Sequence, residues 1–302
     1  MSVRHVLELD DLTPAEVARV LDLAEQPAPG DLLSHQTVGL YFEKPSLRTR
    51  HSCETAVVQL GGHPVTFRKD EIGGSGREPM TDIAQVLSGY HAALGARVFD
   101  HRVLEQLASR SSIPVINLLS DTGHPCQSLA DLLTMRQCFD GELSGRTVAW
   151  IGDFNNVARS LALGAAMTGM RLRIATPTGY GPSEADVDRL VAAGLDGRPF
   201  VTDRPEEAVK TADAVHTDVW ASMGQEDEAD IRHRAFEGFQ VNDAVMAAAP
   251  SHAVFMHCLP AHRGEEVAAS VVDGPQSVVF QQAHNRLHAF RALLQLLVEE
   301  SA

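Results

Sequence analysis

The sequence has few of the features that mark secreted, zinc-ribbon or membrane proteins. Its four cysteines, Cys53, Cys126, Cys138 and Cys258, form no CxxC pair, which argues against a disulfide framework or a zinc ribbon and predicts reduced thiols. None of the fourteen histidines belongs to an HExxH pattern. The opening ten residues contain no apolar core of a signal peptide, and no later apolar run approaches the length of a membrane span. We therefore expect a cytoplasmic protein.

Basic residues are also scarce. The chain has 25 Lys and Arg residues against 40 Asp and Glu, which gives a formal net charge of −15. Nucleic acid and anionic membranes would need a broad basic surface, so we expect neither as a partner. Any anion site must be local. With 302 residues, 44% hydrophobic and 22% charged, the chain is long enough for two ordinary globular domains.

Apolar, β-prone segments alternate with segments of helical period, which predicts βα units and parallel sheets. The expected strands are Thr37–Phe42, Pro64–Phe67, Ala96–Asp100, Pro114–Leu119, Thr147–Ile151, Leu172–Ala175, Pro199–Thr202, Ala214–Thr217, Val254–His257 and Ser277–Phe280. Turn residues gather at 139–142, where we place the domain boundary. The predicted fold is α/β: two parallel-sheet domains, residues 1–138 and 139–282, with a cleft between them. A C-terminal helix within residues 283–302 is expected to pack back on the first domain.

The segment from Phe42 to Arg50 reads as a strand-to-helix turn that can hold a phosphate. Ser46 lies near the helix N-cap, where free backbone N–H groups attract anions. Arg48 and Arg50 add planar guanidinium groups that match phosphate oxygens in pairs. The alternative is a plain helix cap followed by arginines on a solvated face, and this segment alone does not decide between them.

Two further segments of the first half follow or separate predicted strands. The glycine-rich segment Glu71–Pro79 predicts an irregular loop that is a candidate lid. His124 and Gln127 follow a strand and begin a helix, so they belong to the same sheet edge as Arg48. An imidazole there can donate to a carbonyl oxygen and a glutamine can bind an amide, although a lone histidine is more often structural.

The second half has three polar strand ends. Gly152–Val157 lacks the glycines of a dinucleotide fingerprint; its Asn155 and Asn156 can bind a polar ligand or simply cap the helix. Asp218–Glu226 offers a carboxylate, a hydroxyl and main-chain N–H groups, which suits a zwitterionic amino acid. In His257–Pro260, Cys258 is a nucleophile, a proton partner, or a buried inert thiol, which is the default for cysteine.

Taken together, these segments resemble the ornithine carbamoyltransferases of the aspartate/ornithine carbamoyltransferase family, over the whole chain. The resemblance implies transfer of the carbamoyl group of carbamoyl phosphate to the side-chain amine of L-ornithine, giving L-citrulline and phosphate, with no metal or organic cofactor. The family's phosphate turn reads Ser-Thr-Arg-Thr-Arg. The chain matches it at Ser46, Arg48, Thr49 and Arg50 and departs at Leu47, which offers only its backbone N–H.

The resemblance also implies the residues of the first substrate. The expected carbamoyl-phosphate ligands are Ser46, Leu47, Arg48, Thr49, Arg97, His124, Gln127 and Arg286. Within this set, Arg97, His124 and Thr49 would polarise the carbamoyl carbonyl, and Gln127 would hold the carbamoyl nitrogen. Arg286 would reach the phosphate from the terminal helix.

The ornithine residues follow from the same resemblance. The expected ligands are Asn156, Asp218, Ser222, Met223, Cys258 and Leu259, with Asp218 on the α-ammonium group and Cys258 near the reacting amine. Arg97, His124 and Cys258 are the expected catalytic residues. The family further implies a homotrimer or an assembly of trimers, in which the Gly73–Met80 loop reaches a neighbouring subunit.

Three other functions compete with this interpretation. A carbamoyltransferase with another acceptor, such as putrescine, aspartate or an acylated ornithine, would need a different amino-acid site. A non-catalytic phosphometabolite-binding protein would keep Arg48 and Arg50 but has no need of His124, Asp218 and Cys258 together. A nicotinamide dehydrogenase is disfavoured because the glycine fingerprint is missing.

Overall fold

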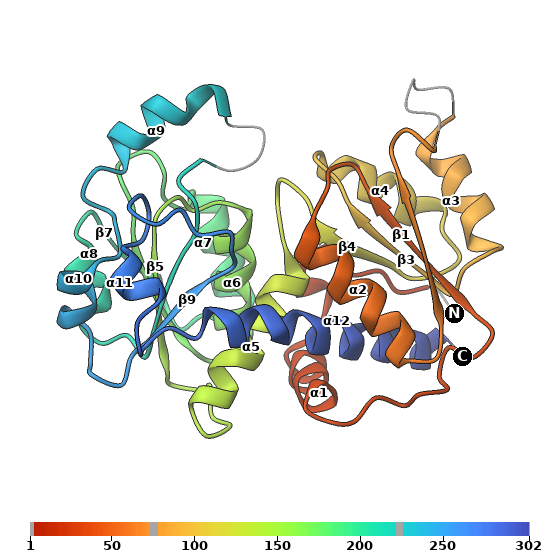
Figure 1. Ribbon diagram of the computed structural model, residues 1–302, viewed down its shortest axis with the longest axis horizontal. Coiled ribbons are helices and arrows are strands. Elements are labelled where there is room, and N and C mark those ends of the chain that lie inside the picture. The colour runs from red at the N-terminus through yellow and green to blue at the C-terminus, as the bar shows by residue number, and fades with distance from the viewer. Residues whose placement is uncertain (1–2, 73–77, 222–225, 302) are drawn as a thin grey trace. The chain divides into compact units, whose positions relative to one another are not determined.

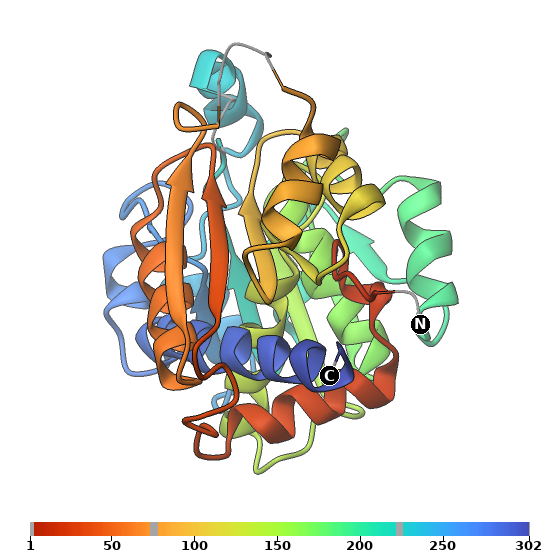
Figure 2. The ribbon, with the colours of Figure 1, turned by 90° about the vertical axis from the view of Figure 1, so that its right-hand side faces the viewer.

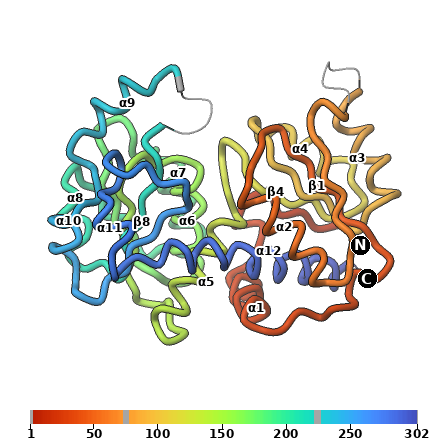
Figure 3. Tube along the Cα trace, viewed as in Figure 1, coloured from red at the N-terminus to blue at the C-terminus, as the bar shows by residue number. Residues whose placement is uncertain are grey.

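The computed structural model describes residues 3–72, 78–221 and 226–301. The chain folds into two compact units, residues 1–133 with 284–302, and residues 134–283. It passes into the second unit within helix α5 (Pro125–Cys138) and returns within helix α12 (Val279–Ser301), as the trace in Figure 3 shows. The division thus falls inside α5, whereas the sequence suggests the turn that follows this helix.

The first unit contains a four-stranded parallel sheet in the order β2-β1-β3-β4 (Figure 1). Its strands are β1 (Thr37–Phe42), β2 (His63–Arg68), β3 (Ala93–Arg97) and β4 (Val115–Leu119). Its helices, besides parts of α5 and α12, are η1 (Leu9–Asp11), α1 (Pro14–Ala24), α2 (Leu47–Gln59), α3 (Met80–Ser88) and α4 (His101–Arg110). Strands β1, β3 and β4 are almost wholly buried, as expected for a parallel sheet covered on both faces.

The second unit contains a five-stranded parallel sheet in the order β7-β6-β5-β8-β9. Its strands are β5 (Thr147–Ile151), β6 (Arg171–Ala175), β7 (Phe200–Thr202), β8 (Ala214–Thr217) and β9 (Val254–His257). Its helices are α6 (Asn156–Met167), α7 (Glu184–Ala192), α8 (Pro205–Val209), η2 (Glu226–Glu228), α9 (Ala229–Ala235), α10 (Asp243–Ala248) and α11 (Ala269–Val272). The predicted class of two parallel-sheet α/β units is therefore confirmed.

Strand pairing brings the polar strand ends of each unit to one sheet edge. In the first sheet β1 pairs with β3, and β3 pairs with β4, all in parallel. The segments that begin at Glu43, Val98 and Ser120 consequently leave the same edge. In the second sheet β5 pairs with β8, and β8 with β9, so the segments after Ile151 and Thr217 also share an edge with the segment after β9. Arg97 and His124 in the first unit, and Asp218 and Cys258 in the second, thus lie at or shortly after the carboxyl ends of neighbouring strands.

The C-terminal helix packs on the first unit, as predicted. Figure 2 shows α12, in blue, next to α1, in red. The Arg291 side chain donates to the carbonyl oxygens of Leu23, Ala24 and Gln26 at the end of α1. None of the helices in the described ranges combines the length and hydropathy needed to cross a bilayer.

Two predicted strands need correction. The third strand is Ala93–Arg97 instead of Ala96–Asp100, because the Asp100 carboxylate accepts from the Arg102 N–H and so caps α4. The segment Ser277–Phe280 is not a strand. It makes a single bridge to Phe255 at Ser277, and α12 begins at Val279. The predicted glycine-rich lid, Glu71–Pro79, has its residues 73–77 outside the described part of the chain.

Candidate functional site

The turn after β1 has the backbone form of a helix cap without the usual side-chain bond. Ser46 is the N-cap of α2, with extended φ and ψ of −152° and 108°, and within the described chain its hydroxyl makes no capping hydrogen bond. Helix capping alone therefore does not explain the serine. Leu47, the first helical residue, is 71% exposed, so it fills no apolar gap within this chain.

The two arginines of this turn differ in their surroundings. Arg48 is half-buried. Arg50 is exposed, and its Nε lies 2.8 Å from Oε1 of Glu54, one helical turn further on. Arg50 therefore forms a surface ion pair along α2 and does not join the buried groups of this edge.

Thr49 connects two buried arginines. Its hydroxyl oxygen accepts from Nη1 of Arg97 at 3.2 Å and from Nη2 of Arg286 at 3.0 Å. Arg97 comes from the end of β3 and Arg286 from α12, and their exposed fractions are only 8% and 4%. The threonine hydroxyl thus holds two guanidinium groups close together at the edge of the first sheet.

Arg286 has only neutral partners. Its Nη1 donates to Oε1 of Gln127 at 2.6 Å, its Nη2 donates to Thr49, and its buried Nε has no hydrogen-bond partner within the described residues. No carboxylate of the described chain lies within ion-pair distance of it. A buried, uncompensated charge is costly, so this position favours an anionic ligand.

His124 lies beside the same arginines. Burial lowers the pKa of His124 well below its ordinary value, and the positive charges of Arg286 and Arg97 lower it further. The imidazole is therefore neutral at physiological pH, with one N–H donor and one acceptor nitrogen. A neutral donor among fixed positive charges can polarise a carbonyl oxygen without giving up its proton.

Gln127 is buried and fixed at both ends of its amide. Its Oε1 accepts from Arg286, and its Nε2 donates to Oδ1 of Asp131 at 2.8 Å. These bonds fix the orientation of the amide. The second lone pair of Oε1 is then suited to an N–H group of a ligand.

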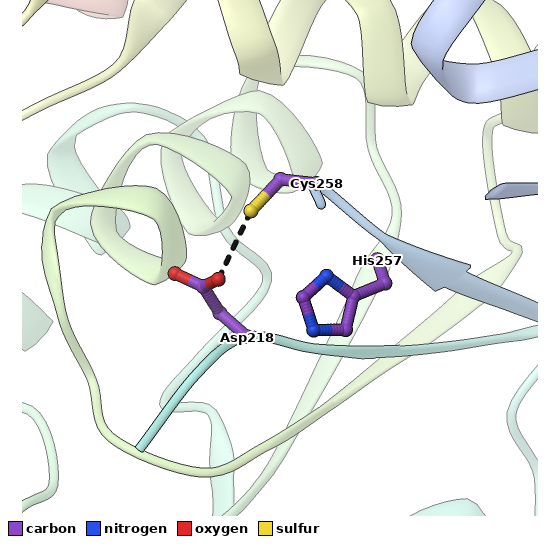
Figure 4. A group of neighbouring side chains, drawn as sticks. All are labelled: Asp218, His257 and Cys258. Carbon is purple, nitrogen blue, oxygen red and sulfur yellow. Dashed lines mark hydrogen bonds between the residues drawn. The ribbon is translucent and has the colours of Figure 1, made fainter. Parts of the chain in front are cut away.

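The edge of the second sheet carries a carboxylate with two side-chain donors. Asp218, 7% exposed, follows β8, and its Oδ1 accepts from Sγ of Cys258 at 3.0 Å (Figure 4). Its Oδ2 accepts from Nδ2 of Asn155 at 2.9 Å. Asp218 is therefore a positioned negative group, and Cys258 is present as a thiol that donates its proton to it.

Asn155, the residue before the predicted ligand Asn156, contacts this carboxylate. Its Oδ1 accepts from the N–H groups of Val157 and Ala158, each at 3.0 Å, so it caps α6 while its amide nitrogen faces Asp218. The cap and the site thus use opposite ends of one side chain. Asn156 is the first residue of α6 and is half-buried.

A buried network supports the end of β9. His257 Nδ1 accepts from the Leu259 N–H at 2.9 Å, so the proton of the neutral ring is on Nε2, which donates to Oε1 of Glu266 at 3.0 Å. The His257 N–H donates to Gln282. Leu259 has a φ of 60°, an unusual conformation for leucine that its N–H bond to His257 supports. Sequence reasoning did not single out Glu266 or Gln282, because nothing local distinguishes them from surface residues.

Among the described residues, two sets place potential metal ligands together. Asp218, His257 and Cys258 have ligand atoms within 4.8 Å of one another (Figure 4), and so have His262, Glu265 and Glu266. In the first set both nitrogens of His257 are engaged by Leu259 and Glu266, which leaves it no lone pair for a metal. The predicted ligands Ser222 and Met223 lie outside the described residues.

Comparison with known proteins gives one consistent result. Residues 4–137 match the family described as aspartate/ornithine carbamoyltransferase, carbamoyl-P binding domain, and residues 144–297 match its Asp/Orn binding domain. The ornithine carbamoyltransferase of Acidothermus cellulolyticus is 49% identical over 98% of this chain and 97% of its own. The crystal structure of that from Thermus thermophilus has a TM-score of 0.89 at 43% identity, covering 98% and 99% of the two chains. The enzyme from Pyrococcus furiosus has a TM-score of 0.90 at 42% identity, covering 97% and 96%.

Proposed function

Because this chain belongs to the aspartate/ornithine carbamoyltransferase family, we propose that it transfers the carbamoyl group of carbamoyl phosphate to the side-chain amine of L-ornithine, giving L-citrulline and phosphate. The observation that carries this proposal is the pair of buried arginines, Arg97 and Arg286, that share the Thr49 hydroxyl. Arg286 has no carboxylate partner in the described chain, so a phosphate dianion would compensate its charge.

The first edge offers what the leaving group and the carbonyl need. As phosphate departs, negative charge grows on its oxygens, and the guanidinium groups of Arg97 and Arg286 stabilise that charge. Neutral His124 donates to the carbamoyl oxygen, and Gln127 accepts from the carbamoyl nitrogen. Arg48 and the backbone N–H groups of Ser46 and Leu47 complete the proposed phosphate contacts.

The second edge offers a partner for the amino acid. The Asp218 carboxylate, held by Asn155 and Cys258, would bind the α-ammonium group of ornithine, and Cys258 and Leu259 would contact the reacting amine. Asn156, Ser222 and Met223 remain predicted ligands. The side-chain ammonium must lose a proton before the amine attacks. A Cys258 thiol that donates its own proton to Asp218 would orient the neutral amine, and Cys258 would accept the amine's proton only as a thiolate.

Parallel assays test the acceptor. Citrulline formation from ornithine should be far faster than carbamoylation of putrescine, aspartate or N-acetylornithine, because only ornithine has both a free α-amino acid group and a side-chain amine. Faster turnover of putrescine would favour the alternative acceptor. Absence of turnover with every amine, together with binding of carbamoyl phosphate, would favour the non-catalytic binding protein.

A charge substitution tests the phosphate half. Arg286→Met should lower kcat/KM for carbamoyl phosphate by about a hundredfold or more, since charged donors to a buried phosphate are worth several kcal/mol. Arg50→Met is the matched control, because Arg50 forms a surface ion pair with Glu54 and should leave kcat/KM nearly unchanged. Equal effects of the two substitutions would contradict the proposed site.

We also propose a homotrimer that works in the cytoplasm in arginine metabolism. None of the four cysteines forms a disulfide within the described chain, which suits a reducing compartment. The first unit has exposed large apolar side chains that a partner subunit would cover, among them Val65, Val86, Tyr90 and Phe99. Sedimentation velocity should give the mass of a trimer, and a monomer at all concentrations would contradict the proposal.

A further inference from the structure

A second group of polar side chains lies in the loop after β9 and on the neighbouring helix α9. Nδ1 of His262 lies 3.6 Å from Oε2 of Glu265 and 3.9 Å from Oε2 of Glu266. On α9, Nε2 of His233 lies 3.6 Å from the same Glu265 oxygen. His262, Glu265 and Glu266 thus form a compact group that His233 contacts at Glu265, and all four residues belong to the second unit.

The backbone holds this loop in place. The Glu265 N–H donates to the His262 carbonyl at 2.9 Å, which closes a turn and puts the two side chains near one another. The carbonyl of Glu265 accepts from the Gln240 side chain at 2.8 Å, and that of Glu266 accepts from the Val241 N–H at 2.9 Å. The ligand atoms are thus carried by an ordered turn.

Glu266 supplies the observation that points to a ligand. Its side chain is fully buried, and its Oε1 accepts from Nε2 of His257 and from the His262 N–H. Its Oε2 is equally buried but accepts no hydrogen bond from any described residue, and Nδ1 of His262 lies 3.9 Å from it. A buried carboxylate oxygen of this kind requires a cation or a donor.

We propose that His262, Glu265 and Glu266 bind a divalent transition-metal ion such as Zn²⁺, and that the exposed His233 ring, which contacts Glu265, rotates in as the fourth ligand. Ligands at bond lengths of about 2.0–2.1 Å in a tetrahedron lie about 3.3 Å apart, close to the separations of 3.6 and 3.9 Å in this cluster. Two imidazole nitrogens favour Zn²⁺ or Co²⁺ over Mg²⁺ and Ca²⁺, which prefer oxygen ligands. His233, His262 and Glu265 reach solvent, so an ion has an entry path.

The proposed site is linked to the end of β9. Glu266 would bind the ion through Oε2 while Oε1 accepts from His257, the residue before Cys258. An ion on one oxygen would withdraw electron density from the other and fix its orientation. Metal binding itself does not depend on the proposed carbamoyl transfer.

Calorimetry with Zn²⁺ and visible absorption with Co²⁺ test the site on chelator-treated full-length protein. We expect one ion per chain, and a Co²⁺ spectrum of nitrogen and oxygen ligands without a thiolate charge-transfer band. His262→Ala and His233→Ala, both at exposed positions, should each lower the affinity by at least about tenfold. His252→Ala is the matched control, because His252 also pairs with a carboxylate at the surface, 3.0 Å from Asp213, but lies outside the cluster. The His252→Ala variant should bind Zn²⁺ as tightly as the wild-type protein does.

The following results of the metal-binding experiments would contradict the proposed site. A thiolate band that disappears in Cys258→Ser would place the ion at Asp218 and Cys258 instead. Equal affinity in wild type, His262→Ala and His252→Ala, or no saturable binding at all, would identify the cluster as an ordinary surface ion pair. Thermal melting of each variant shows whether the fold is retained, and Glu265→Gln provides a second substitution at a half-buried position if one histidine variant unfolds.

Discussion

The Cys258 thiol donates to the Asp218 carboxylate, and this contact allows a prediction about a single residue. Cys258→Ala removes one donor to Asp218 and the group proposed to face the reacting amine. Because a hydrogen bond to a charged group is worth about 1.5–3 kcal/mol, kcat/KM for ornithine should fall by about 10- to 100-fold. Isothermal titration with carbamoyl phosphate should give an unchanged Kd, since that ligand is assigned to the first unit.

Two further variants separate function from folding. Cys258→Ser keeps a donor at the same position and should recover part of the loss. Cys138→Ala alters a half-buried thiol whose pKa is raised by burial and which belongs to neither edge, so its kinetics should match wild type. If Cys258→Ala weakens both substrates equally, the thiol supports the fold instead of the amine.

At the scale of single residues, the sequence predicted which kinds of side chain lie at each sheet edge better than it predicted the hydrogen bonds between them. Strand ends with arginine, histidine and aspartate were correctly expected at two sheet edges, because parallel strands bring their carboxyl ends together. The sharing of the Thr49 hydroxyl by Arg97 and Arg286 could not be predicted, since it joins residues far apart in the chain. The same holds for Asn155, where only the three-dimensional structure shows that one amide both caps α6 and contacts Asp218.

Leu47, at the start of helix α2, is the position where this chain departs from the family's phosphate turn. Leu47 is the first residue of the helix and is mostly exposed, so Leu47→Thr leaves no cavity and should change stability by no more than about 0.5 kcal/mol. The new hydroxyl can add one neutral hydrogen bond to phosphate, worth about 0.5–1.5 kcal/mol. The KM for carbamoyl phosphate should therefore fall by up to about tenfold.

Val58→Thr is the control for this substitution. Val58 is an exposed apolar residue near the other end of α2, so the same type of change there should leave KM unaltered. A wild-type protein that neither binds nor uses carbamoyl phosphate, with both properties restored by Leu47→Thr, would mean that leucine marks a disabled site. A large loss of stability in Leu47→Thr would instead reveal a contact in the assembly that this chain alone does not make.

Two predicted strands are wrong because local composition and tertiary packing favour different structures in those segments. Strand β3 contains Gly95, a poor strand former, which hides the strand in the sequence. A Cβ at Gly95 would lie 3.1 Å from side-chain atoms of Leu40 and Leu118, so the glycine permits close packing between neighbouring strands. At Ser277–Phe280 the β-branched residues suggest a strand, but Val279 is buried as the first residue of α12. Packing of the helix overrides β-propensity there.

At the scale of the whole molecule, the chain's last helix completes a unit built mainly from its first half. Arg291 of α12 is 5% exposed, and its Nη2 donates to three carbonyl oxygens at the carboxyl end of α1. Leu23 and Ala24 belong to the last turn of α1, where a positive charge also complements the helix dipole. Burial lowers the pKa of Arg291, but a guanidinium remains protonated in the physiological range.

Arg291→Met should therefore destabilise the first unit by about 1.5–3 kcal/mol, because it removes a charged donor from three carbonyl oxygens, of which the Ala24 oxygen is in a buried contact. Arg19→Met is the matched control: Arg19 also joins α1 to α12, through Glu299 at 2.9 Å, but it is 54% exposed, and a surface ion pair is worth at most about 1 kcal/mol. Urea unfolding compares the two variants. Peptide-resolved hydrogen exchange then assigns the loss, which should be confined to α1, α12 and the strands they cover, since each unit has its own core. Equal effects of the two substitutions, or lost protection centred on the second unit, would show that Arg291 does not fasten the terminal helix to the first.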